Sequence, residues 1–496
     1  MQSLFNSAVE IVIAGPEYHA MVYDLNFIKE LLKNNGFEKE VMEYFIKCAE
    51  GKSPDKLLKY NQLEKIQKNA RFILYAMVLR KYLRLSLREF HVMLAASPLY
   101  QEFCTLNKWT EVQIPSYQQI GLLENSLDPE FIRKLFNLLG NNVIFNKNKT
   151  KEIGFKQEFT LNNLYSDSTC IKANIHYPVD YVLFRDMIRT AMLKVEKMRK
   201  EGLKVRMPCE PSEFLSGINA LCIEMTMSYR QKDSKKKRKA TFRRMKRYLK
   251  VALGHVKSHL DKFKLEWQNF GFSLLQATLI INALEDILSK HKEVVKIAHT
   301  RIINEKIVLS GDKILSIYED DVHVITRNKD GVKVEFGNTL QIVEQSEGFI
   351  VDYDLLKDVS PGDAECGIQS LKKIVACYGG TTINSIVADR GYDAAKFKKW
   401  LEDYNASHKT NIRYDVLPKK IDELREKMSD DSYKKKHKRR ALSEAKIAHI
   451  KDIAGNPMKQ KTISNRQKHL GIAMFTHNLK KLAKMHRDEN WEQAVS

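Results

Sequence analysis

The stretch Ile386-Val387-Ala388-Asp389-Arg390-Gly391-Tyr392 decides the fold that this sequence predicts. Its apolar start, with two β-branched residues, indicates a strand. The strand ends in an aspartate, and Gly391 favours a turn directly after it. An apolar strand that ends in Asp-Arg-Gly is a common way to present a ligand at the edge of a sheet. We therefore expect Asp389 to lie at such an edge, with its carboxylate available to a ligand.

Two further acids occupy local signals of the same kind. Asp167 closes the strand-like run 164–167, and Glu444 lies on a helix expected within residues 440–451. Phosphodiester cleavage can use two divalent ions, each bound by carboxylate oxygens. Three acids delivered by two strand ends and one helix fit that requirement. Other acids that compete for the metal lie in turn-like or less patterned surroundings: Asp180, Asp320, Asp321 and Asp363.

The helix around Glu444 also carries candidate phosphate ligands. Arg440, Glu444 and Lys451 are spaced i, i+4 and i+11, which places them close to one helix face. Glu444 can then bind metal while Arg440 and Lys451 hold phosphates of the scissile strand. The alternative is a surface ion pair between Arg440 and Glu444. His437 is either a further phosphate contact or a solvated member of the basic run 434–440.

The charge of the chain points to a polyanionic partner. The 496 residues contain 83 Lys and Arg against 61 Asp and Glu, a net charge of +22, and the pI is about 9.4. Such a balance favours nucleic acid before membrane, although a soluble enzyme can also be basic. The seven cysteines show no CxxC pair, which indicates reduced thiols in a cytosol-like compartment. Polar residues interrupt the most apolar later stretch, 272–288, so we expect a core helix there.

A second basic run spans residues 230–250, with Phe242 and Tyr248 interleaved. Charge runs are usually solvated faces. Because this one accompanies a candidate site for DNA chemistry, backbone tracking of DNA is the favoured interpretation. The candidate DNA-binding residues of this run are Lys235, Lys236, Lys237, Arg238, Arg243 and Arg244.

Residues 20–160 are predicted to form short helices with clear starts. Ser86 and Ser116 each begin a capping box, and Asp128 precedes a proline at a first helical position. Such a series allows a helix-turn-helix-like module that places one helix in a major groove. A plain helical dimerisation region is the equal alternative, since no basic stripe marks one helix as the DNA reader.

The remaining pattern predicts an α/β protein whose sheet is split in sequence. Strand-like patterns occur at residues 160–173, 313–318, 332–336, 349–351, 386–388 and 412–417. Long helices fill the segment from 181 to about 306, and further helices are expected at 364–378, 394–404 and 442–453. A helical insertion therefore separates the strand of Asp167 from most of the other strands.

The motifs resemble those of insertion-sequence transposases of the DDE type. Members of that group often carry, around the final acid, Tyr, two residues, Arg, three residues, Glu, six residues and Lys. This chain has His437, Arg440, Glu444 and Lys451 at that spacing, with His where Tyr is usual. Three other segments, in the family's order, are similar to its first-acid, middle and second-acid regions: residues 167–180, 334–338 with 360–364, and 389–392.

The resemblance implies a ribonuclease-H-like mixed sheet flanked by helices, interrupted by a helical insertion and preceded by an all-helical region. The expected domains are a DNA-binding or dimerisation region at 1–158, a catalytic core at 159–180 and 307–485, an insertion at 181–306 and a tail at 486–496. Asp167, Asp389 and Glu444 would hold two Mg²⁺ ions, for which Mn²⁺ can substitute, and Arg390 would join Arg440 and Lys451 on phosphates.

The implied reaction is metal-dependent hydrolysis at the inverted-repeat ends of a transposon, followed by attack of the freed 3′-hydroxyl on target DNA. The expected working unit is a homodimer on paired ends, in a prokaryotic-type cytoplasm at the nucleoid and not at a membrane. Two other functions remain open at this point. One is a catalytically silent DNA-binding protein derived from a transposase, and the other is a structure-specific nuclease without strand transfer.

Overall fold

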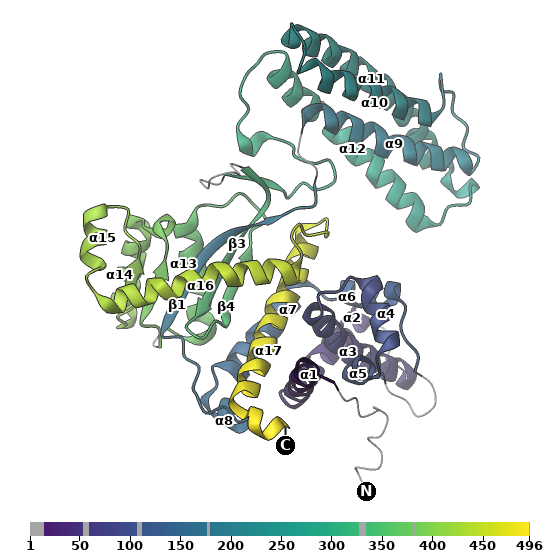
Figure 1. Ribbon diagram of the computed structural model, residues 1–496. Coiled ribbons are helices and arrows are strands. Elements are labelled where there is room, and N and C mark those ends of the chain that lie inside the picture. The colour runs from purple at the N-terminus through teal and green to yellow at the C-terminus, as the bar shows by residue number, and fades with distance from the viewer. Residues whose placement is uncertain are drawn as a thin grey trace. The chain divides into compact units, whose positions relative to one another are not determined.

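The computed structural model describes residues 14–52, 59–106, 112–175, 179–326, 334–380 and 382–495, with side chains except at positions 310, 442–444 and 491–495. The chain divides into two units. Unit 1 combines Met1–Ala173 with Asn338–Ser496, and unit 2 is Asn174–Gly337 (Figure 1). Unit 1 is thus assembled from two segments of sequence that unit 2 separates.

Unit 1 begins with a series of helices whose starts follow the predicted caps. Ser86 and Ser116 accept hydrogen bonds from backbone amides in the first turns of their helices, and Asp128 caps the helix that begins at Pro129. These caps satisfy amides that the first turn leaves without a helical partner. The helices are α1 (Pro16–Asn34), α2 (Phe37–Lys52), α3 (Tyr60–Tyr82), α4 (Leu87–Ala96), α5 (Pro98–Phe103), α6 (Tyr117–Ser126), α7 (Pro129–Leu139), the π-helical turn η1 (Gly140–Ile144) and α8 (Lys147–Ile153).

The N-terminal helices share one core with α17 (Ile463–Val495), the last helix of the chain. The rings of Phe37 and Phe475 are fully buried and lie 5.7 Å apart. His486 Nε2 donates to the Ile153 carbonyl at 3.0 Å, so its Nδ1 accepts from the Tyr23 hydroxyl at 2.7 Å. The segment from residue 486, expected as a tail, therefore begins as part of this packed helix. The N-terminal helices therefore belong to the same unit as strands β1, β4, β5 and β6, whereas β2 and the first residues of β3 fall in unit 2.

A mixed sheet runs through the described residues, as the α/β prediction requires. Its order is β2-β3-β1-β5-β6, and β4 also pairs with β3. β3 is antiparallel to β2 and β4, whereas β5 is parallel to β1 and β6. The strands are β1 (Asn163–Lys172), β2 (His323–Thr326), β3 (Val334–Gln345), β4 (Ile350–Leu355), β5 (Ser385–Ala388) and β6 (Arg413–Val416).

Helices cover both faces of this sheet, because alternate residues of each strand point to opposite sides. Leu164 and Ile386 pack with α13 (Asp363–Tyr378) and α14 (Ala395–His408). Ile171 packs on the other face with α16 (Asp431–Ala454) and α17. The short helices η4 (Arg390–Tyr392) and α15 (Ile421–Lys427) complete this part of unit 1.

Unit 2 is mainly helical, and its apolar side chains form a core of their own. Spacing of three and four residues puts Leu249, Leu253, Val256 and Leu260 on the buried side of one helix. The helices are α9 (Asp180–Lys200), α10 (Pro211–Ser228), α11 (Ser234–Glu266), the turn η2 (Trp267–Asn269), α12 (Leu274–Ile302) and the turn η3 (Ser310–Asp312). None of the described helices of the chain is long and apolar enough to cross a membrane.

One expected strand of unit 2 is wrong. Residues 313–318 form no strand, and Leu315, Ser316 and Ile317 are buried in succession. Ile317 belongs to the core formed by the helices of unit 2. The apolar residues of this segment therefore indicate burial against helices and not pairing in a sheet.

Candidate active site

The pairing of β1 with β5 brings two of the predicted acids level with each other. The strands run parallel, with Tyr165 opposite Val387. Two residues further along the same register, Asp167 comes opposite Asp389, just past the end of β5. Neighbouring strands lie about 4.8 Å apart and residues two apart share a face. The two positions are therefore adjacent on the face of the sheet that carries Tyr165.

Asp167 lies within β1 and not at its end. The strand continues to Lys172, which corrects the expectation that the acid closes the strand. Asp167 is half-buried, and its Oδ1 accepts from the Ser168 amide at 2.8 Å.

Asp389 begins the turn that follows β5. Its Oδ1 accepts from the Gly391 amide at 2.9 Å, which is a side-chain cap on η4. A Cβ at Gly391 would lie 2.2 Å from Asp363 Oδ2, so only glycine fits without displacing that carboxylate. The glycine of the Asp-Arg-Gly-Tyr motif thus allows a third acid to approach the turn.

That third acid, Asp363, is the first residue of α13. Its Oδ1 accepts from the Ser168 hydroxyl at 2.7 Å, and Ser168 directly follows Asp167 on β1. Asp363 therefore ties the strand of one predicted acid to the turn of another. The sequence presented Asp363 as a competitor for the metal, but no sequence signal indicated this bond.

Three side chains, Tyr392, Gln341 and Ser166, form a series of buried hydrogen bonds that links this turn to β3 and β1. The Tyr392 hydroxyl donates to Gln341 Oε1 at 2.8 Å, and Gln341 Nε2 donates to Ser166 Oγ at 2.7 Å. Burial, followed by the charges of Asp363 and Asp167 among its causes, raises the pKa of Tyr392 well above its usual value. The phenol therefore stays protonated and keeps its role as donor.

Helix α16 lies across the face of the sheet that carries Tyr165 (Figure 1). The Arg439 guanidinium lies 5.0 Å from the centre of the Tyr165 ring. Lys436 Nζ donates to Ser385 Oγ of β5 at 2.9 Å and forms an ion pair with Asp415 of β6. These contacts fix α16 over β1, β5 and β6.

The predicted face of α16 is present as a helical face. With 3.6 residues per turn, positions 440, 444 and 451 lie within about 40° of one another around the axis. Ile447 lies about 20° beyond the edge of this arc and packs into the core beneath α16. Position 444 is therefore on the side of the helix directed to the sheet, although the Glu444 side chain is outside the described residues.

The predicted phosphate ligands differ in what they contact. Arg390 is exposed, and Arg440 is half-buried with a buried Nε that has no hydrogen-bond partner among the described side chains. Lys451 is half-buried and engaged in an interaction within the fold. Arg440 is thus the member of this set with a buried guanidinium donor that no described residue accepts.

His437 does not lie where a phosphate contact requires. It is buried, and its Nε2 donates to the Asp415 carbonyl at 2.9 Å. Burial lowers the pKa of His437 to about 4, in spite of the hydrogen bond, so the imidazole is neutral at pH 7. Its position favours a packing role at the junction of α16 and β6.

The described side chains include no group of three acids, histidines or cysteines arranged for a metal ion. Asp167 and Asp389 supply two adjacent carboxylates, and hard oxygen donors of this type suit magnesium, which keeps several waters. The donor chemistry of these two carboxylates therefore suits a divalent ion.

Part of the chain is similar to a known protein family. Residues 326–479 match the family described as transposase DDE domain. This match confirms the predicted resemblance to DDE-type transposases and indicates a function of transposase type. No curated protein and no solved structure matches the chain.

The match to the transposase DDE domain covers part of the candidate site. It includes Asp389, Glu444 and the predicted phosphate ligands Arg390, Arg440 and Lys451, whereas Asp167 lies before it. The link from the domain to Asp167 therefore rests on the pairing of β1 with β5.

Two acids that compete for the metal in sequence are occupied by ion pairs in unit 2. Asp180 Oδ1 lies 2.7 Å from Arg301, and Asp320 Oδ1 lies 2.7 Å from Lys290. Their carboxylates are already neutralised by neighbouring cations, which leaves them less available to a metal than Asp167 and Asp389.

Some basic side chains of the run on α11 make contacts within unit 2, and others do not. Lys235 lies 3.1 Å from Glu305, and Arg244 makes two contacts of 2.8 Å with Glu224. Lys237 donates to Gln231 at 2.9 Å, and Arg238 lies over the Tyr229 ring. Among the described residues, only two members of the predicted set make no ion pair, hydrogen bond or ring contact: Lys236 and Arg243.

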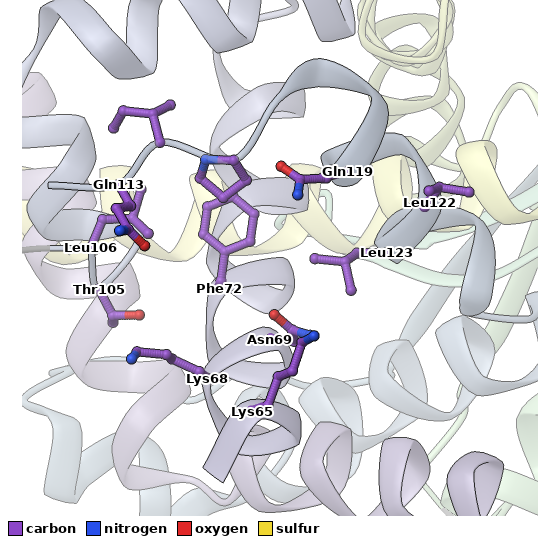
Figure 2. Close-up of a pocket in the computed structure, with 12 residues that line it drawn as sticks. Lys65, Lys68, Asn69, Phe72, Thr105, Leu106, Gln113, Gln119, Leu122 and Leu123 are labelled. Atoms are coloured by element: carbon purple, nitrogen blue, oxygen red, sulfur yellow. The ribbon is translucent and has the colours of Figure 1, made fainter. Parts of the chain in front are cut away.

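A separate pocket of about 630 Å³ lies among the N-terminal helices. Figure 2 shows Lys68 and Asn69 on α3 between Thr105 on one side and Leu123 of α6 on the other. Among the described residues, its lining contains lysines and amides but no carboxylate, imidazole or thiol. It offers none of the ligands of the candidate active site and lies apart from it in the fold.

Proposed function

We propose that this protein is a DNA transposase that cleaves DNA at transposon ends and joins the freed 3′-hydroxyl to target DNA. The observation that carries the proposal is the parallel register of β1 and β5, which sets Asp167 opposite Asp389 beneath α16. The position of Glu444 on the sheet-facing side of α16, within the matched domain, supports the same assignment.

A ribonuclease-H-like core is part of this proposal. It is supported by the sheet, in which β1 is flanked by β3 on one side and by the parallel strands β5 and β6 on the other. Helices on both faces and the first acid in the central strand agree with such a core.

Asp167, Asp389 and Glu444 would hold two Mg²⁺ ions, with Mn²⁺ as a substitute. Such ions activate the attacking oxygen and stabilise the leaving oxygen of a phosphodiester. Arg390, Arg440 and Lys451 would bind phosphates beside the scissile bond, since guanidinium and ammonium groups pair well with phosphate oxygens. A homodimer on paired ends remains our proposal for the working unit.

The test is excision and reintegration of a marker bounded by the DNA that flanks the gene. Wild type is compared at equal protein levels with Asp389→Asn, Glu444→Gln and, as a matched control, Asp422→Asn. Asp422 is an exposed acid on α15, 3.7 Å from Arg425. We expect movement with wild type and the control, and none with the other two variants.

Other outcomes separate the alternatives. Movement that survives Asp389→Asn or Glu444→Gln removes that residue from the metal site. Purified protein that cuts DNA with Mg²⁺ but yields no joined product would be a nuclease. End-binding without cutting in any metal would identify a silent DNA-binding protein.

A further inference from the structure

Helix α11 has two chemically opposite faces. Its apolar face, which includes Phe242, Met245 and Leu249, is buried in the core of unit 2. Its exposed face is basic, and the sequence contains no acidic residue between Asp233 and Asp261. A helix of this length therefore presents uninterrupted positive charge to the solvent.

Five cations of the exposed face form a row that we call the α11 ridge: Lys236, Arg243, Arg247, Lys250 and Lys257. With 3.6 residues per turn they fall within an arc of about 80° and extend over about 30 Å of the axis. All five are exposed, and none makes an ion pair or hydrogen bond with the described residues.

Several other cations of α11 form ion pairs within unit 2. Lys239 lies 2.8 Å from Glu305, Arg244 lies 2.8 Å from Glu224, and Lys264 forms an ion pair with Glu285. The surface acids of the unit thus pair with the flanks of the helix and leave the ridge uncompensated. Like charges held in a row repel one another, so the ridge is suited to an external anion of matching length.

A groove of about 600 Å³ runs beside the ridge, between α11 and α12. Leu253, Leu288 and Val295 contribute apolar lining, while Lys246 on α11 and Lys292 on α12 add cations at its edge. Cations from two helices can therefore surround one strand of a polyanion.

We propose that the α11 ridge and this groove bind the sugar–phosphate backbone of duplex DNA. About 30 Å corresponds to roughly nine base pairs at 3.4 Å each, so the row matches a run of consecutive phosphates. α11 contains no Asn or Gln, the side chains that read adenine, which favours backbone contact over base readout. The inference rests on the proposed function in taking DNA as the partner.

Gly254 offers an independent indication of a close approach at this surface. It lies mid-helix on the line of the ridge and in the lining of the groove, and a Cβ there would meet nothing within 4 Å. Glycine inside a helix costs about 1 kcal/mol relative to alanine. Since nothing in unit 2 requires glycine at this position, the bare backbone is suited to an external ligand.

The test measures binding of full-length protein to a labelled random-sequence duplex in EDTA, across a range of KCl concentrations. The ridge variant is Arg247→Gln/Lys250→Gln/Lys257→Gln. The matched control is Arg244→Gln/Lys239→Gln/Lys264→Gln, which removes the same charges from ion-paired positions of the same helix.

We expect the ridge variant to bind on the order of tenfold to a hundredfold more weakly, and the slope of log K against log[KCl] to fall by about 2.7 for three lost contacts. The control should keep the wild-type slope. Gly254→Gln should fold normally and weaken binding several-fold by blocking the approach. Circular dichroism checks folding in each case.

Equal losses in the ridge variant and the control would overturn the inference, because net charge alone would then explain them. An unchanged slope in the ridge variant would overturn it as well, while DNA binding by wild type would leave the proposed function intact. A wild type that fails to bind DNA at any salt concentration would overturn both.

Discussion

The two units bury different kinds of side chain. In unit 1 the buried Glu124 accepts a hydrogen bond from Arg80 at 3.2 Å and lies 3.2 Å from His469, all far from solvent. In unit 2 the core consists mainly of aliphatic and aromatic side chains on α9–α12. Unit 1 therefore combines its apolar cores with buried ionic contacts between distant segments, whereas unit 2 depends mainly on apolar helix faces.

The units also differ in charge. With 32 Lys and Arg against 20 Asp and Glu, residues 174–337 carry a net +12 of the +22 of the whole chain. Unit 1 holds the candidate carboxylates and unit 2 the basic ridge. The comparison suggests a division of labour in which unit 1 performs chemistry and unit 2 supplies sequence-independent affinity for DNA.

The largest expected effect tests this division directly. Asp389→Asn in unit 1 should lower the rate of DNA cleavage on the order of a thousandfold, because a neutral amide is a poor ligand for a divalent ion. The same variant should bind duplex DNA in EDTA as wild type does. A parallel loss of binding would show that the two functions are not divided between the units.

Core truncations test whether each unit has a stability of its own. Phe475→Ala in unit 1 and Phe242→Ala in unit 2 remove fully buried rings and should each cost about 3–5 kcal/mol. Differential scanning calorimetry should show each variant lowering a different transition. A single transition that shifts equally in both variants would show that the units unfold together.

The sequence predicted elements better than the contacts between them. The caps at Ser86, Ser116 and Asp128 depend on residues three positions apart, so local spacing was sufficient. The strand expected at 313–318 was wrong because apolar side chains report burial without identifying the element that covers them. Apolar periodicity therefore fixes which side of an element is buried but not what covers it.

The candidate site was predictable in its acids but not in their support. Strand and helix patterns located Asp167, Asp389 and Glu444, which stay a prediction as a metal site. The bond between Ser168 and Asp363 joins residues 195 positions apart, and that between Gln341 and Ser166 joins residues 175 apart. Only the tertiary fold creates such pairs.

The basic run shows the same limit in unit 2. The sequence marked Arg244 as a DNA contact, but Glu224 neutralises it across the α10–α11 pair. Arg247 and Lys250, beyond the densest part of the run, remain exposed and unpaired among the described side chains. Which cations stay available depends on where the acids of neighbouring helices fall.

The comparison also predicts different responses to acid. His437, His469 and His477 are buried in unit 1, and burial lowers their pKa values to about 4, about 3 and about 3. In unit 2, burial likewise lowers the pKa of His259. A histidine whose folded pKa lies below its unfolded value of about 6.5 loses stability as pH falls below 6.5, because the unfolded chain binds the proton more readily.

At pH 5 each of these three histidines should lower the free energy of unfolding of unit 1 by about 2 kcal/mol. Thermal melting at pH 7.5 and pH 5 should lower the unit 1 transition, identified by Phe475→Ala, more than that of unit 2. His477→Phe should reduce the shift of the unit 1 transition. Equal shifts of both transitions would contradict the difference between the cores.

The smallest effects concern two glycines with opposite surroundings. Gly254→Ala in unit 2 adds a Cβ to open space and should stabilise that unit by about 1 kcal/mol, since alanine is the better helix former. Gly391→Ala in unit 1 would place a Cβ 2.2 Å from Asp363 Oδ2, so it should destabilise unit 1 and displace that carboxylate. Melting temperatures give the sign of each change, and cleavage by Gly391→Ala reports the displacement. If the two substitutions changed stability in the same direction, close packing at the Asp389 turn would not explain why glycine is present there. The contrast between the closely packed turn in unit 1 and the open surface around Gly254 in unit 2 would then fail.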